Sequence, residues 1–327
     1  MNRVAVIGGG AFGTALANAA ALAGREVVLW LRDPSEAASL AKTRESVRLP
    51  GIPLRPEVAP TADVAALGGA EAALLVVPAQ AVRAALAGPA ASLPAECPVV
   101  ICAKGIERET GLFMSEVAQE VRPGASLAVL SGPSFAADIA RGLPTAVTLA
   151  AADEGLAARL AAALSGPTFR VYHSADRRGV EIGGAAKNVL AIGAGIVAGR
   201  GLGESARSAL VARGFAELLR FAAANGARPE TLMGLSGLGD VVMSCSSAQS
   251  RNFALGLRLG EGASPGEASG GKLAEGAFTA EALLQRARAL GVEMPVAEAV
   301  ADILAGRGSV DEAVAGLMAR PLKPERG

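Results

Sequence analysis

The sequence is poor in the side chains that most metal sites and nucleophilic triads require. Its 327 residues include one His, His173, and three Cys at positions 97, 102 and 245. One His excludes a multi-histidine metal site and argues against a Ser-His-Asp triad. Three Cys without metal-ligand spacing indicate neither a metal cluster nor a disulfide framework. We therefore expect no bound metal.

The sequence also lacks a charge excess and has few aromatic side chains. Lys plus Arg and Asp plus Glu each number 31, aromatic residues are 3% and hydrophobic residues are 51%. Balanced charge argues against a nucleic-acid binder that works through bulk positive charge. The high apolar content excludes a disordered chain. A chain of this length predicts two domains, with cores built from Ala, Val, Leu and Ile.

The N-terminal segment has some features of a signal peptide or membrane helix, because no charged residue lies between Arg3 and Arg25. Glycines at positions 8, 9, 10 and 13 break this apolar run near its start. A strand over 4–7, a glycine turn and a helix over about 12–23 explain the same residues better. No other stretch reaches the roughly 20 uncharged apolar residues of a membrane span. We therefore expect a cytoplasmic protein.

Short apolar runs alternate with helical segments in the first half of the chain. This alternation indicates a parallel sheet that is covered by helices on both faces. Residues 48–60 are rich in Pro, and we expect an irregular loop there. The predicted strands are 4–7, 26–31, 73–77, 99–102, 127–130, 146–149 and 169–173, and two of the predicted helices are 80–86 and 112–121.

The second half consists of long Ala/Leu/Gly-rich segments without a strand pattern. We expect an α/β fold in which a Rossmann-type doubly wound sheet, residues 1–178, is followed by an all-α domain, residues 179–327. Residues 264–272 have the composition of a mobile surface loop, and the tail from Pro321 is expected to fray. The predicted helices are 180–199, 204–225, 252–259, 279–290 and 296–305.

A glycine-rich turn follows the first predicted strand. Residues 8–13, Gly-Gly-Gly-Ala-Phe-Gly, fit the pattern Gly-x-Gly-x-x-Gly at the start of a helix. Gly8 allows the tight turn, Gly10 allows a pyrophosphate to approach the backbone, and Gly13 allows close helix–strand packing. The helix N-terminus attracts phosphate. We interpret the turn as a dinucleotide site; the alternative is a glycine turn without a ligand.

The residues after the second strand bear on the choice of cofactor. Arg32 would pair with a 2′-phosphate, whereas Asp33 would accept hydrogen bonds from the ribose hydroxyls if it faced inward. A solvated surface arginine is the alternative for Arg32. The sequence leaves open which of the two side chains faces the ligand.

One Lys interrupts the most apolar predicted helix. Lys187 and Asn188 follow Glu-Ile-Gly-Gly-Ala-Ala in a segment that should be buried on nearly all sides. A buried ammonium is costly unless it is paired, and burial tends to lower its pKa. Such a lysine can exchange a proton near neutral pH, which suits carbonyl reduction. The alternative is a lysine that extends to solvent or pairs for structural reasons.

Polar clusters stand on otherwise apolar ground. Two of them, at 102–105 and 131–135, follow predicted strands, where open α/β sheets bind ligands. Two more, at 237–240 and 250–252, lie in the helical half, and Arg251 there opens a helix that suits an anion. Each cluster alone is more often a turn or a cap, but their joint presence indicates a site.

These motifs together resemble the bacterial NAD(P)-dependent sn-glycerol-3-phosphate dehydrogenases over nearly the whole chain. The motifs that carry the resemblance are residues 8–16, 103–107, 130–136, 179–188, 237–240, 250–252 and 274–276. The resemblance implies reversible hydride transfer between NAD(P)H and dihydroxyacetone phosphate, which gives sn-glycerol 3-phosphate for glycerophospholipid synthesis. NADP or NAD is the implied cofactor.

The resemblance also implies residue roles. Lys187 matches the proton donor and acceptor, and Lys104 matches a lysine that touches both cofactor and substrate. The substrate residues implied are Lys104, Gly132, Ser134, Lys187, Asp240, Ser250, Arg251 and Asn252. The cofactor residues implied by the glycine motif and the resemblance are Gly8, Gly10, Ala11, Phe12, Gly13, Arg32, Lys104, Ala136, Arg251, Leu273 and Glu275.

The sequence departs from the family pattern at three places, with Arg48 for the usual Tyr, Phe12 for Trp and Ser236 for Thr. None of these changes removes a catalytic group, but Arg48 leaves the packing on the cofactor side open. Two other functions remain as alternatives, a dehydrogenase of a 3-hydroxy acid and a non-enzymatic dinucleotide sensor. A homodimer fits the low charge, and the sequence does not decide against a monomer.

Overall fold

The computed structural model describes residues 1–270 and 275–321. The chain divides into two compact units. The first unit contains residues 1–104 and 112–181, and the second contains residues 105–111 and 182–327. The sequence did not indicate that the short segment 105–111 belongs with the helical half of the chain.

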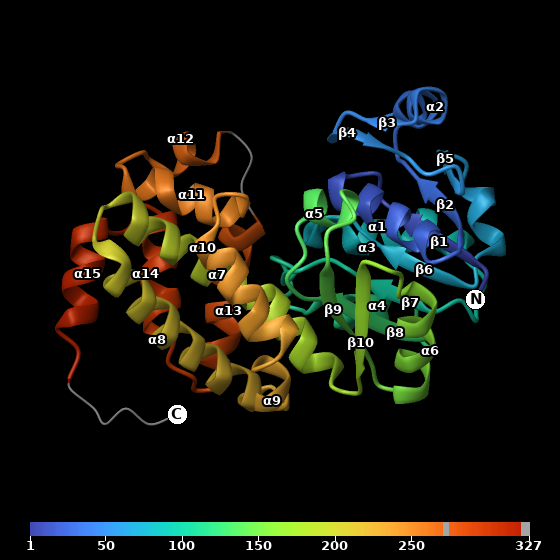
Figure 1. The fold of residues 1–327 in the computed structure, drawn as a ribbon. Coiled ribbons are helices and arrows are strands. Elements are labelled where there is room, and N and C mark those ends of the chain that lie inside the picture. The colour runs from blue at the N-terminus through green and yellow to red at the C-terminus, as the bar shows by residue number, and fades with distance from the viewer. Residues whose placement is uncertain (271–274, 322–327) are drawn as a thin grey trace. The chain divides into compact units, whose positions relative to one another are not determined.

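The first unit is built on an eight-stranded sheet in the order β10-β9-β8-β7-β6-β1-β2-β5 (Figure 1). The strands are β1 (Arg3–Ile7), β2 (Glu26–Trp30), β5 (Val58–Thr61), β6 (Ala72–Leu75), β7 (Val99–Ile101), β8 (Leu127–Ser131), β9 (Thr145–Ala151) and β10 (Phe169–Ser174). Neighbouring strands are parallel except for β8 and β9, which are antiparallel. The expectation of a wholly parallel sheet was wrong there, because a strand buried on both faces reads as an apolar run in either direction.

The side chains of each strand alternate between two cores. In β1, Val4 and Val6 face one core and Ala5 and Ile7 face the other, as the period of two requires. Helices α1 (Ala11–Leu22) and α6 (Glu154–Leu164) pack on the first core, and α3 (Val82–Ala87) and α4 (Met114–Val121) pack on the second. The predicted covering of both faces is confirmed. The remaining elements on this side are α2 (Pro34–Thr43), α5 (Ala136–Ala140), η1 (Val64–Gly69), η2 (Ala79–Ala81) and η3 (Pro89–Ser92).

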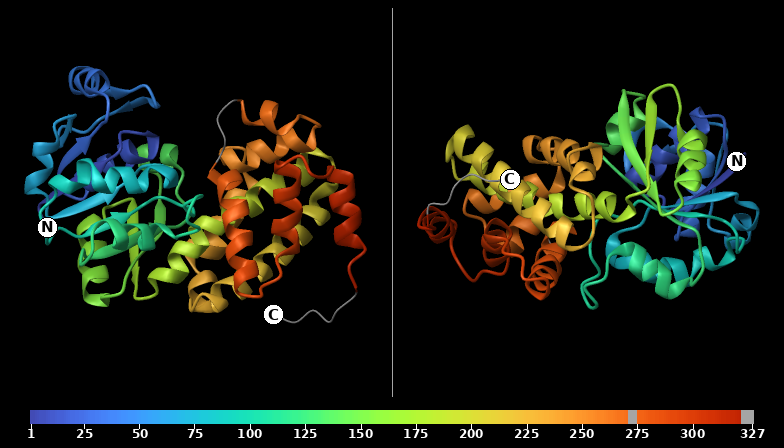
Figure 2. Two further views of the ribbon diagram at one scale, coloured as in Figure 1. Left: turned by 180° about the vertical axis from the view of Figure 1, so that it is seen from behind. Right: turned by 90° about the horizontal axis from the view of Figure 1, so that it is seen from below.

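The segment 48–60 is more regular than its Pro content suggested. Strands β3 (Glu45–Ser46) and β4 (Leu49–Pro53) form a small hairpin, and β5 pairs with β2 at the sheet edge. The hairpin and α2 extend past that edge (Figure 1, Figure 2). Pro60 is tolerated because an edge strand needs no hydrogen bond on its outer side. Arg48 donates to both carboxylate oxygens of Glu36, at 2.9 and 3.2 Å, so it joins this hairpin to α2.

The second unit is helical, and no strand follows Ser174 in the described part of the chain. Its elements are α7 (Arg177–Gly199), α8 (Gly203–Ala224), α9 (Pro229–Leu232), the π-helical turn η4 (Leu235–Gly239), α10 (Asp240–Ser246), α11 (Arg251–Gly260), α12 (Pro265–Ser269), α13 (Glu275–Ala289), α14 (Pro295–Leu304) and α15 (Val310–Met318). The first five residues of α7 belong to the first unit.

The expected loop at 264–272 was wrong for its described part. Ser264 and Glu267 form a capping box around Pro265, and this starts α12. Ser-x-x-Glu with Pro at the first helical position is a recognised helix start. The composition of the segment hid that signal. Residues 271 and 272, and the tail beyond Pro321, lie outside the described residues.

Helix α7 packs against α11 at unusually short range. A Cβ at Gly195 would lie 2.2 Å from the carbonyl oxygen of Phe253, and one at Gly256 would lie 2.0 Å from that of Ile192. Side chains at these positions would therefore push the two backbones apart. These glycines therefore serve a helix–helix contact and not a turn.

Among the described residues, α7 is the one helix that is long and apolar enough to cross a membrane. Of its most apolar 18-residue window, 89% is buried inside the protein. This degree of burial is typical of the core helix of a folded domain, as its apolar sequence predicted.

A buried carboxylate caps the N-terminus of α14. Glu217 on α8 is 2% exposed, and it accepts hydrogen bonds from the backbone N–H groups of Val296 at 2.8 Å and Ala297 at 3.2 Å. Burial raises the pKa of Glu217 to about 7, although both hydrogen bonds act to lower it. The folded protein therefore holds a proton on this group more tightly than the unfolded chain does.

We expect Glu217→Gln to change how stability depends on pH. The contribution of Glu217 is full below about pH 4.5 and is lost as pH rises through about 7, which amounts to about 3 kcal/mol. The variant should lose that part of the pH dependence between pH 4.5 and 8, measured by urea unfolding. Glu230→Gln, which changes an exposed carboxyl on α9, is the control. Equal slopes for the wild type and Glu217→Gln would contradict the assignment.

Candidate active site

The glycine turn at residues 8–13 is shaped by contacts that exclude side chains. Gly8 has a φ of +123°, and a Cβ there would lie 2.2 Å from the carbonyl oxygen of Val76. A Cβ at Gly13 would lie 1.8 Å from the carbonyl oxygen of Gly8. Gly8 N–H donates to Trp30 O at 3.0 Å, and Val76 N–H donates to Ile7 O at 2.9 Å. The turn thus lies between the ends of β2 and β6, beside β1, where the strand order reverses.

Gly10 has a different environment from the other two glycines. Nothing lies within 4 Å of the position that its Cβ would occupy. It is also the N-cap of α1, and no side chain caps the helix. The first N–H groups of α1 therefore have no side-chain cap, and this fits a helix end that binds the pyrophosphate of a dinucleotide. Ala11 and Phe12 begin α1, Ala136 begins α5, and all three are half-buried against the same apolar core.

The end of β2 separates the roles of two neighbouring side chains. Asp33 is the N-cap of α2, and its Oδ1 accepts from the N–H and hydroxyl of Ser35, both at 2.8 Å. These hydrogen bonds lower the pKa of Asp33. Arg32 is exposed and makes no hydrogen bond or ion pair within residues 1–270 and 275–321. A ribose-binding role for Asp33 fits poorly with its use as a helix cap, whereas Arg32 can meet a phosphate.

Three of the predicted substrate residues meet at one carbonyl in the first unit. Lys104 Nζ donates to Gly132 O at 2.9 Å, and Ser134 Oγ donates to the same oxygen at 3.0 Å. Lys104 follows β7, and Gly132 follows its parallel neighbour β8, so both lie at the carboxyl edge of the sheet. Gly132 has a φ of +143°, and a Cβ there would lie 2.9 Å from Val147 Cα. A larger residue at 132 would therefore displace the carbonyl that holds Lys104.

The second unit holds a buried ion pair at its most apolar helix. Lys187 Nζ lies 2.6 Å from Asp240 Oδ1 and 2.6 Å from Ser244 Oγ. Ser244 Oγ also donates to Asp240 Oδ1 at 3.2 Å. Lys187 is 7% exposed, Asp240 0% and Ser244 1%. Lys187 is thus largely buried, and the Asp240 carboxylate compensates its charge.

The turn η4 explains why Asp240 reaches Lys187. A Cβ at Gly183 on α7 would lie 2.4 Å from the carbonyl oxygen of Ser236, so η4 approaches α7 one helical turn before Lys187. A Cβ at Gly237 would lie 1.9 Å from Leu232 O, which keeps the turn tight. π-Helical turns are frequent at functional sites because they re-aim a side chain. Asp240 follows directly and starts α10.

A second polar group lies one residue further along α7. Asn252 Nδ2 donates to Asn188 Oδ1 at 2.9 Å, and Asn252 Oδ1 accepts from Gly276 N–H at 3.1 Å. Ser250 is the N-cap of α11, and its hydroxyl accepts from Phe253 N–H at 3.3 Å. This bond gives Ser250 a structural role at the predicted site.

Arg251 is the first residue of α11 and is exposed. It makes no hydrogen bond or ion pair in the part of the chain that the structure describes. Of the other predicted cofactor residues, Leu273 and the side chain of Glu275 lie outside the described residues.

Local sequence patterns predicted no role for Ser244 and no ligand-binding role for Asn188. The i,i+4 spacing of Asp240 and Ser244 on one helix face was the available signal. That signal is weak, because such spacings are common and the partner Lys187 is 57 residues away from Ser244. For metals, no group of three or more His, Cys, Asp or Glu in the described chain could hold an ion.

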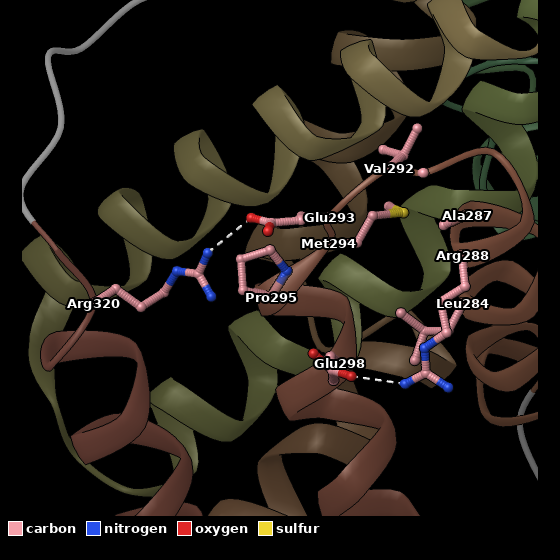
Figure 3. A pocket seen from close by; sticks show the side chains of 10 residues that line it. Leu284, Ala287, Arg288, Val292, Glu293, Met294, Pro295, Glu298 and Arg320 are labelled. Atoms are coloured by element: carbon pink, nitrogen blue, oxygen red, sulfur yellow. Dashed lines mark hydrogen bonds and ion pairs between the residues drawn. The ribbon is translucent and has the colours of Figure 1, made fainter.

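A pocket in the second unit lies away from these residues. It has a volume of about 360 Å³ and lies at the turn between α13 and α14 (Figure 3). Its charged side chains form pairs, Arg320 with Glu293 at 3.1 Å and Arg288 with Glu298 at 2.7 Å. No predicted site residue lines the pocket. We therefore place the candidate site at Lys187 and not in this hollow.

Comparisons with known proteins place similar chains in one family of dehydrogenases. Residues 3–157 match the family model described as NAD-dependent glycerol-3-phosphate dehydrogenase N-terminus, and residues 176–315 match the corresponding C-terminus. A glycerol-3-phosphate dehydrogenase (NAD(P)+) from Methylobacterium radiotolerans is 66% identical over 98% of this chain and 97% of its own length. One from a Bradyrhizobium species is 60% identical over 98% of both chains. The crystal structure of glycerol-3-phosphate dehydrogenase from Coxiella burnetii matches with a TM-score of 0.92 and 35% identity, covering 98% of this chain and 99% of that one.

We expect the Lys187–Asp240 pair to be strongly coupled in stability. Lys187→Ala should lower the free energy of unfolding by about 3–5 kcal/mol, because it leaves a buried carboxylate without its partner. The double variant Lys187→Ala/Asp240→Ala should lose less than the sum of the single losses, by about 2 kcal/mol. Urea unfolding measures all three.

Arg288→Ala is the matched control for this cycle. It breaks an ion pair of similar length, 2.7 Å, whose partners are both at least half exposed. We expect its cost to stay below about 1 kcal/mol. Additive losses at Lys187 and Asp240 would contradict the coupling.

Proposed function

Because the chain belongs to the NAD-dependent glycerol-3-phosphate dehydrogenase family, we propose that it interconverts dihydroxyacetone phosphate and sn-glycerol 3-phosphate with NADPH or NADH. The activity is that of an oxidoreductase acting on a CH–OH group, and its product serves glycerophospholipid synthesis. The observation that carries the residue assignment is the buried ammonium of Lys187 between Asp240 and Ser244.

In the proposed reaction Lys187 is the proton donor. When the reduced nicotinamide cofactor is bound, it would supply the hydride that adds to the keto carbon. Lys187 gives a proton to the carbonyl oxygen as charge develops there, and takes it back in the reverse direction. Asp240 stabilises the charged ammonium, and Ser244 orients it through a 2.6 Å contact. The buried surroundings strengthen both interactions.

The other predicted residues bind and orient. We propose that the glycine turn and the N-terminus of α1 bind the cofactor pyrophosphate. Arg251 suits the substrate phosphate, since it is an exposed guanidinium on the first turn of α11, and Asn252 lies beside it. Lys104 and Ser134, held at Gly132 O, suit the polar end of the substrate. These residues raise the rate by orienting the substrate and by stabilising the charge that develops on it.

The reaction is tested by an absorbance assay of NADPH and NADH oxidation with dihydroxyacetone phosphate. Lys187→Ala should lower turnover on the order of a hundredfold or more, consistent with loss of a general acid. Cofactor binding, followed by nicotinamide fluorescence, should stay within about twofold in protein whose fold is checked by circular dichroism. Near-normal turnover of a folded Lys187→Ala variant would refute the role.

Two outcomes of this assay would favour other functions. The protein would be a hydroxy-acid dehydrogenase if it oxidised the reduced cofactor with a non-phosphorylated 3-keto acid, the oxidised form of a 3-hydroxy acid, and not with dihydroxyacetone phosphate. Tight cofactor binding without turnover on either would indicate a dinucleotide sensor.

The exposed guanidinium of Arg32 generates a prediction about the choice of cofactor. Arg32→Ala should raise KM for NADPH on the order of tenfold, because a charge-assisted contact to the 2′-phosphate is worth about 1.5–3 kcal/mol. KM for NADH should change little, because NADH lacks that phosphate. Steady-state kinetics with each cofactor measure the difference. Equal changes for both cofactors would show that Arg32 does not read the phosphate.

Two further expectations remain predictions. The three cysteines are all free and buried, which fits the reducing cytoplasm. Helix α15 has no buried residue, and Met318 on it is 81% exposed, which fits contact with a second copy of the chain in a homodimer.

A further inference from the structure

The segment 105–111 departs from the sheet-containing unit directly after Lys104. The chain belongs to the first unit up to Lys104, to the second unit over 105–111, and to the first unit again from residue 112. Inside the second unit the segment contacts α13. Arg286 Nη1 donates to Gly111 O at 3.1 Å, and the guanidinium of Arg108 lies 5.8 Å from the centre of the Phe278 ring.

Arg286 is itself held in place. Its Nε donates to Asn225 Oδ1 at 3.0 Å, and Asn225 Nδ2 donates to Phe221 O at 2.8 Å. Asn225 is the C-cap of α8. One guanidinium therefore joins the end of α8, the last turn of α13 and the segment 105–111. The planar fork of Arg, with several N–H donors at fixed angles, suits such a bridge, and Lys cannot reproduce it.

Hydrogen bonds within the segment 105–111 make it rigid, so a restraint at Gly111 also restricts the start of the segment. Gly111 N–H donates to Glu107 O at 2.9 Å, and Thr110 Oγ1 donates to Glu107 Oε2 at 2.6 Å. Ile106 is fully buried and Glu107 is 8% exposed. Gly111 has a φ of +69°, a conformation that favours glycine. The turn over 107–111 is thus compact, and it begins three residues after Lys104.

We infer that Arg286 is a positioning residue for Lys104. In the first unit Lys104 is held through its side chain at Gly132 O, and its backbone continues directly into the segment that Arg286 holds. This inference rests on the proposed function, in which Lys104 contacts substrate and cofactor. No ligand contact is assigned to Arg286 in that proposal. A displacement of about 1 Å at a reacting group can lower rates about a hundredfold, so the restraint matters for catalysis.

A double-mutant cycle tests the inference in the full-length protein. Arg286→Ala should lower kcat/KM for dihydroxyacetone phosphate on the order of tenfold. In the background of Lys104→Ala it should lower kcat/KM by less than about twofold, because the residue through which it acts is gone. Arg288→Ala, two residues along the same helix and in an exposed ion pair, should leave kcat/KM within about twofold.

Hydrogen exchange gives a second readout that does not depend on activity. Arg286→Ala should raise amide exchange in residues 105–111 on the order of tenfold, with little change in peptides from α7 or α11. Arg286→Lys, which keeps a donor but not the fork, should restore part of that protection and serves if the alanine variant folds poorly. Unchanged exchange in 105–111, or fully additive losses in the cycle, would overturn the inference. A wild-type protein without activity on dihydroxyacetone phosphate would instead overturn the proposed function, and the exchange data would still decide whether Arg286 holds the segment.

Discussion

The proposed chemistry of this protein depends on one buried ion pair, between Lys187 and Asp240. An ammonium in an apolar helix is unfavourable unless an opposite charge lies beside it. The pair exists because η4 approaches α7 at Gly183, where a Cβ would lie 2.4 Å from Ser236 O. The same approach brings Ser244 within hydrogen-bonding distance of the amine. Removing the glycine would therefore disturb the charge balance as well as the packing.

Glycine has a second use in the helical unit, and it differs from its use in the sheet. In the glycine turn at residues 8–13, Gly8 supplies a positive φ that other residues rarely adopt. In α7 and α11 the glycines at 195 and 256 have ordinary helical backbones and serve only to let two helices meet. Asn188 and Asn252 lie along this contact and bond to each other at 2.9 Å. Close helix packing thus builds the polar group beside the ion pair.

Helix α7 is also anchored at its beginning, within the first unit. Glu181 is 4% exposed and accepts from the N–H and the hydroxyl of Ser115, both at 2.7 Å. Burial raises the pKa of Glu181, while these bonds and Arg178 act in the opposite direction. Arg178 also pairs with Glu116 at 2.7 Å. The first residues of α7, the helix that carries Lys187, are therefore held against α4 by Ser115 and Glu116.

Much of the fold could be read from local patterns. The apolar runs predicted seven of the eight strands of the main sheet, and β6, β7 and β8 were clear because both of their faces are buried. The missed strand, β5, lies at the edge and contains Pro60, so its sequence looks like a loop. The reversed direction of β9 left no trace in the sequence, since periodicity carries no polarity.

The sequence by itself determined the glycine turn, the apolar helix and the presence of Lys187 within it, because these depend on neighbours within a few residues. Only the tertiary structure decided which groups the lysine meets. Asp240 and Ser244 lie more than 50 residues from it, and α2 uses Asp33 as a cap that local spacing had left open for a ligand. Segment 105–111 shows the same limit, since its partner Arg286 is 175 residues beyond Gly111. Contacts of this kind depend on how whole elements pack, and no short pattern of residue types encodes them.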